Sequence, residues 1–349
     1  MLSLRDLNRA TLARQHLLSR HEGAVADVVH RLVGLQAQEP RPPYLGVWSR
    51  LAGFERDDLH AALHARTLVR ATMWRATLHL VTAADFAAFR PVAEPVLAAA
   101  ARRFDGIDTG AVVAAAERLL AGGPMTFNEL RPKLLEEFPG GYDRALGYVV
   151  RMLTPLIMEP TDDRWSFPRD AAFGLPGIEP APASVPALVE RYLAGFGPAT
   201  PADVATWSGL RGIREVMSGM ELERLADDTG RELYDLPGAP RPGGDVPAPV
   251  RFLPDFDTLL LGHADRRRVL ADEHKGLVAT KNLRIKAVYL VDGFAAGTWQ
   301  IKRSGKKAKL LISPFVATDL GQVEEEGLRL LAFAEPDATT TALEVTGAQ

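Results

Sequence analysis

Residues 237–249 contain five prolines and three glycines. Proline removes a backbone donor and glycine is entropically costly in regular structure, so this segment sustains neither a helix nor a central strand. It predicts a linker between a helical N-terminal part and a C-terminal part rich in β-structure. A second break is predicted at 174–186. With 349 residues, the chain is long enough for two to four domains.

A helix-start motif occurs twice before the linker. Gly-Pro-x-Thr stands at 123–126 and again at 197–200, and each threonine is placed to cap the N-terminus of a helix. After the first motif, periodicity predicts a helix over Tyr142–Ile157 and then a strand-like pair around Thr161–Phe167. Helix, helix and two-stranded ribbon is the order of a winged helix-turn-helix.

The first hundred residues follow the same order. Alternation over Leu68–Val81 predicts a wing-like hairpin around Met73 and Trp74. A winged helix is a scaffold for protein contacts as well as DNA contacts, so DNA binding does not follow from this pattern alone. The segments with helical periodicity are Val25–Leu35, Pro43–Leu51 and Arg56–Ala65.

The chain is therefore predicted to be an α+β protein with three tandem winged-helix units followed by a C-terminal β-barrel-like domain. The predicted bounds are 1–105, 106–175 and 176–236 for the three units, and 250–349 for the β-rich domain.

The segment Gln36-Ala37-Gln38 places two neutral amides between an apolar run and a proline cluster. The prolines bias the chain away from helix, and in an extended segment residues two apart share one side. The two carboxamides then converge and offer donors and acceptors without charge, which suits holding a water or contacting a base edge. The alternative is a polar helix end with two solvated glutamines.

Arg75, Thr77 and His79 alternate along the predicted first wing. Alternation would put all three side chains on one strand face, near the glutamine pair. We therefore predict that these three residues contribute to DNA binding.

The C-terminal part concentrates positive charge, although the whole chain carries a net charge of −3. From Lys281 to Lys309 there are eight basic residues and one acid, Asp292. Alternation predicts a hairpin whose tip carries Arg303, Lys306 and Lys307, with no acid nearby in the sequence. Such a tip suits contact with DNA phosphates. A solvated edge hairpin, whose lysines prevent sheet-to-sheet aggregation, is the alternative.

Composition excludes several kinds of chemistry. The chain has no cysteine, so disulfides, thiolate nucleophiles and cysteine-ligated zinc are ruled out. The only histidines at i, i+4 spacing are His60 and His64, and the sequence shows no third ligand, so no metal site and no cofactor are predicted. No signal peptide or membrane-spanning run is visible, so we expect a cytoplasmic protein.

Six short motifs occur in order along the chain: Arg14–Leu18, Gly34–Pro40, Arg70–His79, Gly197–Thr200, Ala205–Gly209 and Phe252–Asp257. Taken together, they resemble the motifs of the AlkZ/YcaQ-type winged-helix DNA glycosylases. The resemblance implies that Gln36 and Gln38 form the catalytic motif. Glutamine at the second position is similar to the AlkZ-like subclass, whereas YcaQ-like members have aspartate there.

The activity implied is hydrolysis of the N-glycosidic bond of N7- or N3-alkylated purines, with unhooking of interstrand crosslinks in the AlkZ-like subclass. An N7-alkylated purine is already cationic and leaves without protonation, so neutral amides that position a water suffice. Positioning supplies up to roughly 7–11 kcal/mol. No lysine precedes Lys133, which favours a monofunctional hydrolase without a Schiff base.

The expected partner is double-stranded DNA with alkylated purines or crosslinks, bound by a monomer. Two alternatives stay open on the sequence: a non-enzymatic winged-helix DNA-binding protein such as a transcriptional regulator, and a protein-interaction scaffold.

Overall fold

The computed structural model describes residues 1–104, 106–280, 284–316 and 320–346, so Lys281 of the basic segment lies outside the described residues. Its helices are α1 (Leu4–Arg14), α2 (Val25–Arg31), α3 (Arg41–Trp48), α4 (Arg56–His64), α5 (Ala83–Ala101), α6 (Thr109–Leu120), α7 (Phe127–Glu137), α8 (Asp143–Leu153), α9 (Val185–Phe196), α10 (Pro201–Ser208), α11 (Ile213–Ser218), α12 (Thr258–Leu261), α13 (Lys275–Val278) and α14 (Gly321–Ala334), with 3-10 turns η1 (Trp74–Ala76) and η2 (Asp272–His274).

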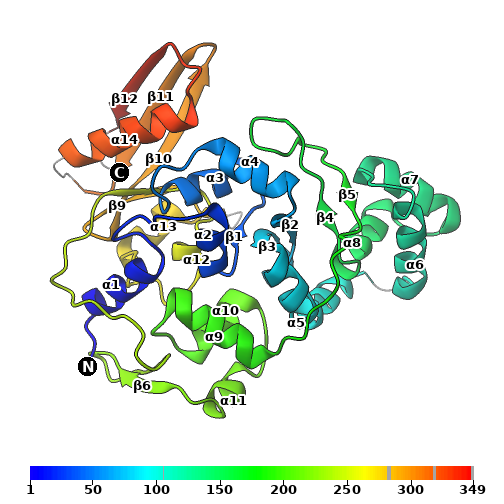
Figure 1. Ribbon diagram of the computed structural model, residues 1–349, viewed down its shortest axis with the longest axis horizontal. Coiled ribbons are helices and arrows are strands. Elements are labelled where there is room, and N and C mark those ends of the chain that lie inside the picture. The colour runs from blue at the N-terminus through cyan, green and yellow to red at the C-terminus, as the bar shows by residue number, and fades with distance from the viewer. Residues whose placement is uncertain (105, 281–283, 317–319, 347–349) are drawn as a thin grey trace.

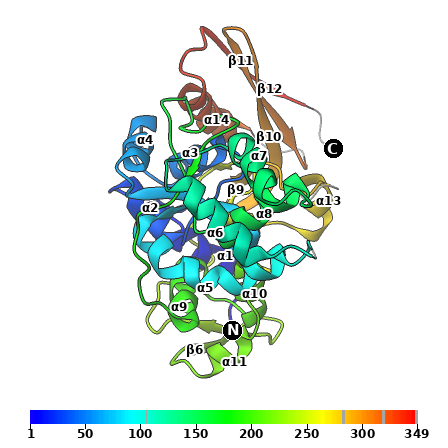
Figure 2. The same ribbon diagram turned by 90° about the vertical axis from the view of Figure 1, so that its right-hand side faces the viewer.

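The strands form two five-stranded sheets and one two-stranded ribbon. The strands are β1 (Leu35–Gln36), β2 (Leu68–Thr72), β3 (Leu78–Thr82), β4 (Ile157–Met158), β5 (Phe173–Gly174), β6 (Glu223–Ala226), β7 (Glu232–Asp235), β8 (Arg251–Leu253), β9 (Val288–Val291), β10 (Phe294–Ser304), β11 (Lys307–Pro314) and β12 (Thr340–Val345). In both views, β10 to β12 and α14 lie at the opposite end from α9, α11 and β6 (Figures 1 and 2).

The first sheet joins segments that the sequence assigns to different units. Its strand order is β1-β3-β2-β4-β5, and β2 pairs with β4 at Ala71 and Ile157. The predicted hairpin over Leu68–Val81 is confirmed, because β2 and β3 pair antiparallel. The ribbon that follows α8 therefore extends the sheet of the first wing. The predicted boundary between residues 105 and 106 assigns strands of one sheet to two different units.

Local signals place most of the predicted helices correctly. Thr126 accepts a hydrogen bond from the backbone N–H of Glu129, and the Glu129 carboxylate accepts one from the N–H of Thr126. Thr200 and Asp203 form the same reciprocal cap at the start of α10. Both predicted N-caps are confirmed, and each satisfies donors that the first helical turn leaves free.

The predicted strand pair around Thr161–Phe167 is wrong. The two strands are β4 and β5, and the segment between them is a loop, here called the β4–β5 loop (159–172). Within it, the N–H of Thr161 donates to Ser166 O at 2.6 Å, and the N–H of Ser166 donates to Asp163 O at 2.7 Å. Two consecutive aspartates favour such a turn over a strand, because short polar side chains bond to nearby backbone.

The C-terminal sheet is open. Its strand order is β12-β11-β10-β9-β8, with β12 and β8 at its edges in the described part of the chain. No closed barrel is found there, which corrects the barrel-like prediction. Helix α14 packs on the sheet through a core that includes Phe252, Leu310, Leu330 and Leu331. Covering one face with a helix buries that face without closing the sheet.

The predicted linker over 237–249 contains no helix or strand, as expected. Side chains of α1 nevertheless hold this segment by hydrogen bonds. Arg14 donates to both carboxylate oxygens of Asp235 at 2.7 and 2.8 Å and also to Pro240 O, and Arg9 donates to Val246 O. A Cβ on Gly197 would overlap this buried ion pair, so glycine is required at that position.

Among the helices of the described residues, none combines the length and the apolar composition needed to cross a membrane.

Candidate active site

The glutamine motif lies in the first sheet. Leu35 and Gln36 form β1, which pairs with β3 so that Gln36 stands opposite His79. The predicted extended backbone is confirmed at Leu35 and Gln36, where the helix-end alternative is excluded, whereas Gln38 lies in a bend. Gln36 is 9% exposed and Gln38 is exposed, so one amide is inside the sheet and the other faces solvent.

Both carboxamides accept hydrogen bonds from the β2–β3 hairpin, Gln36 from its turn and Gln38 from the first residue of β3. Arg75 Nη2 donates to Gln36 Oε1 at 2.8 Å, and the backbone N–H of Leu78 donates to Gln38 Oε1 at 3.3 Å. A charge-assisted bond is stronger than a long bond between neutral groups. A carbonyl oxygen accepts two hydrogen bonds, so each glutamine retains one acceptor position. Gln36 is thus firmly oriented, while Gln38 can accept from a water.

A buried arginine holds the backbone of the motif. Arg70 Nε donates to Ala37 O at 2.8 Å and Nη2 donates to Gln38 O at 3.1 Å, while the guanidinium lies over the Phe167 ring at 4.8 Å. Burial lowers the pKa of Arg70 to about 10, which leaves it protonated at neutral pH. Sequence reasoning missed this residue as a functional one, although it begins one of the motifs that carry the family resemblance.

Arg75 occupies a turn rather than a strand. It lies in η1 with φ of 51°, so the predicted alternation of Arg75, Thr77 and His79 on one strand face is wrong. Besides Gln36, it donates to the carbonyl oxygen of Trp207. Burial lowers the pKa of Arg75 to about 10, and no carboxylate lies within ion-pair distance among the described residues. Thr77 is partly buried and its hydroxyl donates to Trp74 O at 3.0 Å.

A motif more than a hundred residues away supports this turn. The rings of Trp74 and Trp207 lie 4.9 Å apart, and α10 ends at Gly209 with φ of 81° close to Arg75. A left-handed helix end of this kind favours glycine. The Ala205–Gly209 motif therefore helps position Arg75, and through it Gln36.

His79 lies beneath the motif and is only 2% exposed. Its Nδ1 donates to Thr77 O at 3.0 Å. Burial, together with the charge of Arg75, lowers the pKa of His79 to about 3, so the ring is neutral at physiological pH. In this structure His79 has no surface with which to contact a DNA phosphate.

Because His79 is buried in its neutral form, we expect the free energy of unfolding to decrease in acid. The folded pKa is about 3 and that of an unfolded histidine is about 6.5, so the unfolded chain binds more protons between these values. The free energy of unfolding should therefore fall as pH drops below about 6.5, with His79 contributing about 1.4 kcal/mol per pH unit. His79→Leu should make the slope between pH 6 and 4 shallower in urea titrations, and the exposed-residue variant His30→Leu should not. Equal slopes in wild type and His79→Leu would contradict the assignment.

A cavity of about 730 Å³ opens next to the motif. It begins at Glu39, immediately after Gln38, and lies between the start of α3 and the C-terminal sheet. The residues with charged side chains that line it are Glu39, Arg41, Asp255, Arg284 and Lys286. Trp299 and Ile301 add apolar surface. A cavity of this size is in the range that holds a drug-sized or nucleotide-sized ligand.

The predicted basic hairpin is confirmed as β10 and β11, joined at Gly305 and Lys306. The expectation that its tip has no acid nearby is wrong for Arg303, because Arg303 Nη1 pairs with Glu335 at 2.8 Å. This acid comes from the end of α14 and is not local in sequence. Lys306 and Lys307 are exposed, and neither has an ion-pair partner within the described residues.

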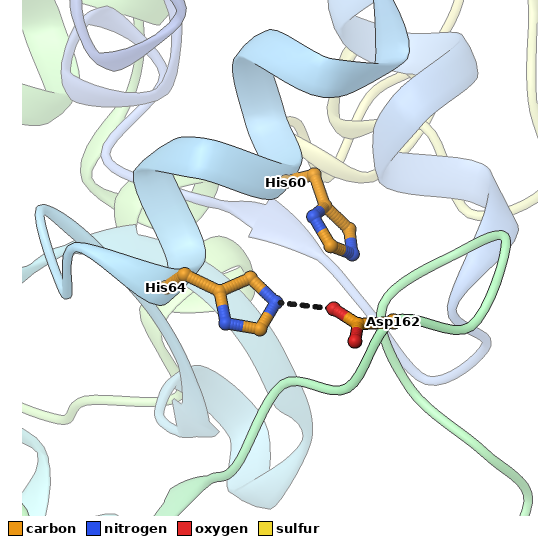
Figure 3. Close-up of side chains that lie close together, drawn as sticks. All are labelled: His60, His64 and Asp162. Carbon is orange, nitrogen blue, oxygen red and sulfur yellow. Dashed lines mark ion pairs between the residues drawn. The ribbon is translucent and has the colours of Figure 1, made fainter.

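Away from the glutamine motif, the part of the chain that the structure describes holds one cluster of side chains that could bind a metal ion. His60 and His64 of α4 face Asp162 of the β4–β5 loop (Figure 3), and ligand atoms of the three residues lie within 4.8 Å of one another. The sequence indicated no third ligand for this histidine pair. The fold supplies one from about a hundred residues downstream.

Two further motifs meet in a buried ion pair. Arg50 donates to both carboxylate oxygens of Asp257, at 2.9 and 2.7 Å, and also to Gln15 Oε1 at 3.3 Å. Arg50 and Asp257 are fully buried. The Arg14–Leu18 and Phe252–Asp257 motifs therefore join α1, α3 and α12 beneath the site, and their role is to hold the fold together.

The chain matches a family of DNA glycosylases over most of its length. The family model described as DNA glycosylase AlkZ-like matches residues 29–333, so the chain belongs to this family of DNA glycosylases. Membership in a family of enzymes favours the glycosylase over the regulator and the scaffold.

Two comparisons with Streptomyces sahachiroi proteins agree with this assignment. The chain is 26% identical over 339 residues to an interstrand DNA cross-link repair glycosylase, covering 88% of this chain and 89% of that protein. It is also similar to the solved structure of the DNA glycosylase AlkZ, with a TM-score of 0.79, 23% identity, and coverage of 99% of this chain and 100% of that one. The second comparison shows the same α+β fold.

Proposed function

We propose that this protein is a monofunctional DNA glycosylase that hydrolyses the N-glycosidic bond of N7- and N3-alkylated purines in double-stranded DNA, and that it unhooks interstrand crosslinks. The observation that carries the proposal is the glutamine motif: Arg75 binds the amide of Gln36, Arg70 holds the backbone of Ala37 and Gln38, and a cavity begins at the next residue, Glu39. The name of the S. sahachiroi relative, which describes cross-link repair, supports the second part.

In the proposed reaction, Gln38 accepts a hydrogen bond from the attacking water. Gln36, whose amide is oriented by Arg75, hydrogen-bonds the same water. The water oxygen bonds to the anomeric carbon, the bond to the purine nitrogen breaks, and the electron pair neutralises the cationic base. The water proton passes to solvent. No general acid is needed for a base that is already charged. An uncharged purine would need one, so selectivity for alkylated bases follows from the weakness of the catalyst.

The cavity beside Gln38 gives room for the lesion. Enzymes that act on a base take it out of the stack and hold it in a pocket. We propose that the extruded nucleotide enters the cavity between Glu39 and Trp299, and that Arg41, Arg284 and Lys286 at its wall face the adjoining phosphates.

Monofunctional action has a direct chemical test because Lys286 lines the same cavity. A lysine that attacked the sugar would form a Schiff base, which borohydride traps as a covalent protein–DNA adduct. We expect no trapped adduct.

We also propose that the helical part consists of three winged-helix units, 1–105, 106–175 and 176–236, followed by the domain at 250–349. Each unit has helices followed by a ribbon: β2 with β3, β4 with β5, and β6 with β7. In this proposal the role of the first hairpin in DNA recognition is indirect. Its residues Arg75, Thr77 and His79 support the backbone and side chains of the glutamine motif. We expect the protein to act as a monomer, which analytical ultracentrifugation with and without duplex tests.

The decisive experiment measures base release. Incubation with a duplex containing N7-methylguanine should release free N7-methylguanine and leave abasic sites that alkali cleaves. A second duplex, crosslinked through the N7 atoms of two guanines, should be separated into its two strands under denaturing conditions. Tight binding without release from either duplex would instead identify a non-enzymatic DNA-binding protein.

The hairpin tip gives a prediction about DNA contact. Lys306 and Lys307 have no acidic partner, so we propose that they bind phosphates beside the lesion. Lys306→Gln with Lys307→Gln should weaken duplex binding and reduce the slope of log K against log salt by about 0.9 per lost contact. Crosslink unhooking should fall more than monoadduct release, because a crosslinked base stays tethered to the other strand and cannot be flipped freely.

Lys309→Gln is the matched control for this prediction. Lys309 is exposed on the same hairpin but pairs with Glu344 at 3.1 Å, so its loss should change the salt slope less. An unchanged slope and unchanged activity in the Lys306/Lys307 variant would leave the hairpin as a device for solubility.

A further inference from the structure

We propose that His60, His64 and Asp162 bind a divalent transition-metal ion, with Zn²⁺ as the best fit, and that the ion fastens the β4–β5 loop to α4. Figure 3 shows the three side chains facing one another across the gap between the helix and the loop. The cluster is separate from the glutamine motif, and the proposal does not depend on the glycosylase activity.

The spacing of the ligands fits a zinc ion after a small adjustment. His60 and His64 are one helical turn apart, so their rings lie on the same face of α4, with centroids 4.5 Å apart. His64 Nε2 lies 3.8 Å from Asp162 Oδ1. Tetrahedral bonds of about 2.0–2.2 Å require ligand atoms about 3.3 Å apart. The side chains of His64 and Asp162 are 40% and 99% exposed, so they are free to move inward.

The first ligand is already oriented by a backbone carbonyl. His60 Nε2 lies 3.0 Å from Thr161 O, and since a carbonyl only accepts, Nε2 is the protonated nitrogen. This leaves Nδ1 unprotonated, the form in which a histidine nitrogen binds a metal. A ligating histidine usually donates its other N–H to a carbonyl or carboxylate in this way, which fixes the tautomer and the ring.

The backbone of the loop around Asp162 is ordered without a metal. The hydrogen bonds within Thr161–Ser166 close a compact turn, and Trp165 packs edge-on against Tyr44 at 5.1 Å. Within the described residues, His64 is the only group in ion-pair distance of the Asp162 carboxylate. The carboxylate therefore has no competing partner that a metal would have to displace.

The donor set selects the class of metal. Two imidazoles and one carboxylate suit Zn²⁺ and neighbouring transition metals, whereas Mg²⁺ and Ca²⁺ prefer oxygen ligands alone. Three protein ligands leave a fourth position for water. The same loop carries Phe167, which lies against the guanidinium of Arg70. A bound ion would thus steady the loop that packs on the arginine holding the glutamine backbone.

The test uses the full-length protein after dialysis against EDTA, with ZnCl₂ alone as the probe. Titration calorimetry should show one ion bound per chain, and saturating Zn²⁺ should raise the midpoint of thermal unfolding by roughly 3–5 °C. Co²⁺ in place of Zn²⁺ should give visible absorption bands of a low-symmetry site. MgCl₂ should give neither effect.

His64→Ala and Asp162→Asn should each abolish the calorimetric signal and the shift in melting midpoint, and both are exposed positions at which folding is retained. Asp163→Asn is the matched control, because this neighbouring carboxylate accepts from the Thr161 hydroxyl instead. The control should bind Zn²⁺ like the wild type. Absence of Zn²⁺ binding in the wild type would overturn the proposal. Zn²⁺ binding as tight as that of the wild type in His64→Ala and Asp162→Asn would overturn it as well.

Discussion

Replacing Gln38 by alanine should slow the release of N7-methylguanine by about 100- to 1000-fold, the usual effect of removing one preorganised polar group from a reaction centre. Gln38 is the exposed amide, and its acceptor is engaged only by a long bond from Leu78. Gln36→Ala should have a comparable effect, because it removes the amide that Arg75 holds beside the water. Single-turnover assays on a defined duplex measure both rates.

Duplex affinity should change less than about twofold in both variants, since most of the binding free energy comes from phosphates. Gln322→Ala, an exposed glutamine on α14, is the control and should behave like the wild type. Gln38→Asp should still release monoadducts, because the related YcaQ-like subclass has aspartate there. If rate and affinity fell together in Gln38→Ala, the motif would have a structural role instead.

The second large effect is expected in stability. Asp257→Ala leaves the guanidinium of Arg50 buried without its carboxylate, and breaking one side of a buried ion pair costs about 3–5 kcal/mol. The variant also loses the cap of α12, because Asp257 accepts from the N–H of Leu259 at 2.9 Å. Urea unfolding followed by circular dichroism measures the change.

Asp255 provides a control from the same motif. It pairs with Arg284 at 3.3 Å, but both side chains are partly exposed, so Asp255→Ala should cost less than about 1 kcal/mol. Arg50→Met combined with Asp257→Leu should recover part of the loss, because no charge is then left buried. Equal destabilisation in Asp255→Ala and Asp257→Ala would refute the importance of the buried pair.

Sequence reasoning succeeded where the determining forces are local. The caps at Thr126 and Thr200, the β2–β3 and β10–β11 hairpins and the extended glutamine motif all depend on residues a few positions apart. It failed where the partner is distant. Glu335 pairs with Arg303 across 32 residues, and the Trp207 carbonyl accepts from Arg75 across 132. Periodicity carries no information about such contacts.

The same limit explains the errors in architecture. Strand alternation predicts that a sheet forms but not which strands lie at its edges, so the C-terminal sheet was expected to close. The sharing of one sheet by β2 and β4 rests on a single pairing between Ala71 and Ile157. Asp162, the third member of the histidine cluster, could not be predicted either, because it lies about a hundred residues from His60 and His64 in the sequence.

The contacts of α1 bear on how the chain folds as it is made. Arg14 needs Asp235, and Asn8 needs the carbonyl of Gly293, partners that are 221 and 285 residues further along. At about 5–20 residues per second, the ribosome finishes them roughly 10 to 60 s after α1 is synthesised. During that time the side chains of Asn8 and Arg14, which are buried in the folded protein, remain hydrogen-bonded to water. These contacts of α1 therefore form only after the C-terminal third of the chain has been made.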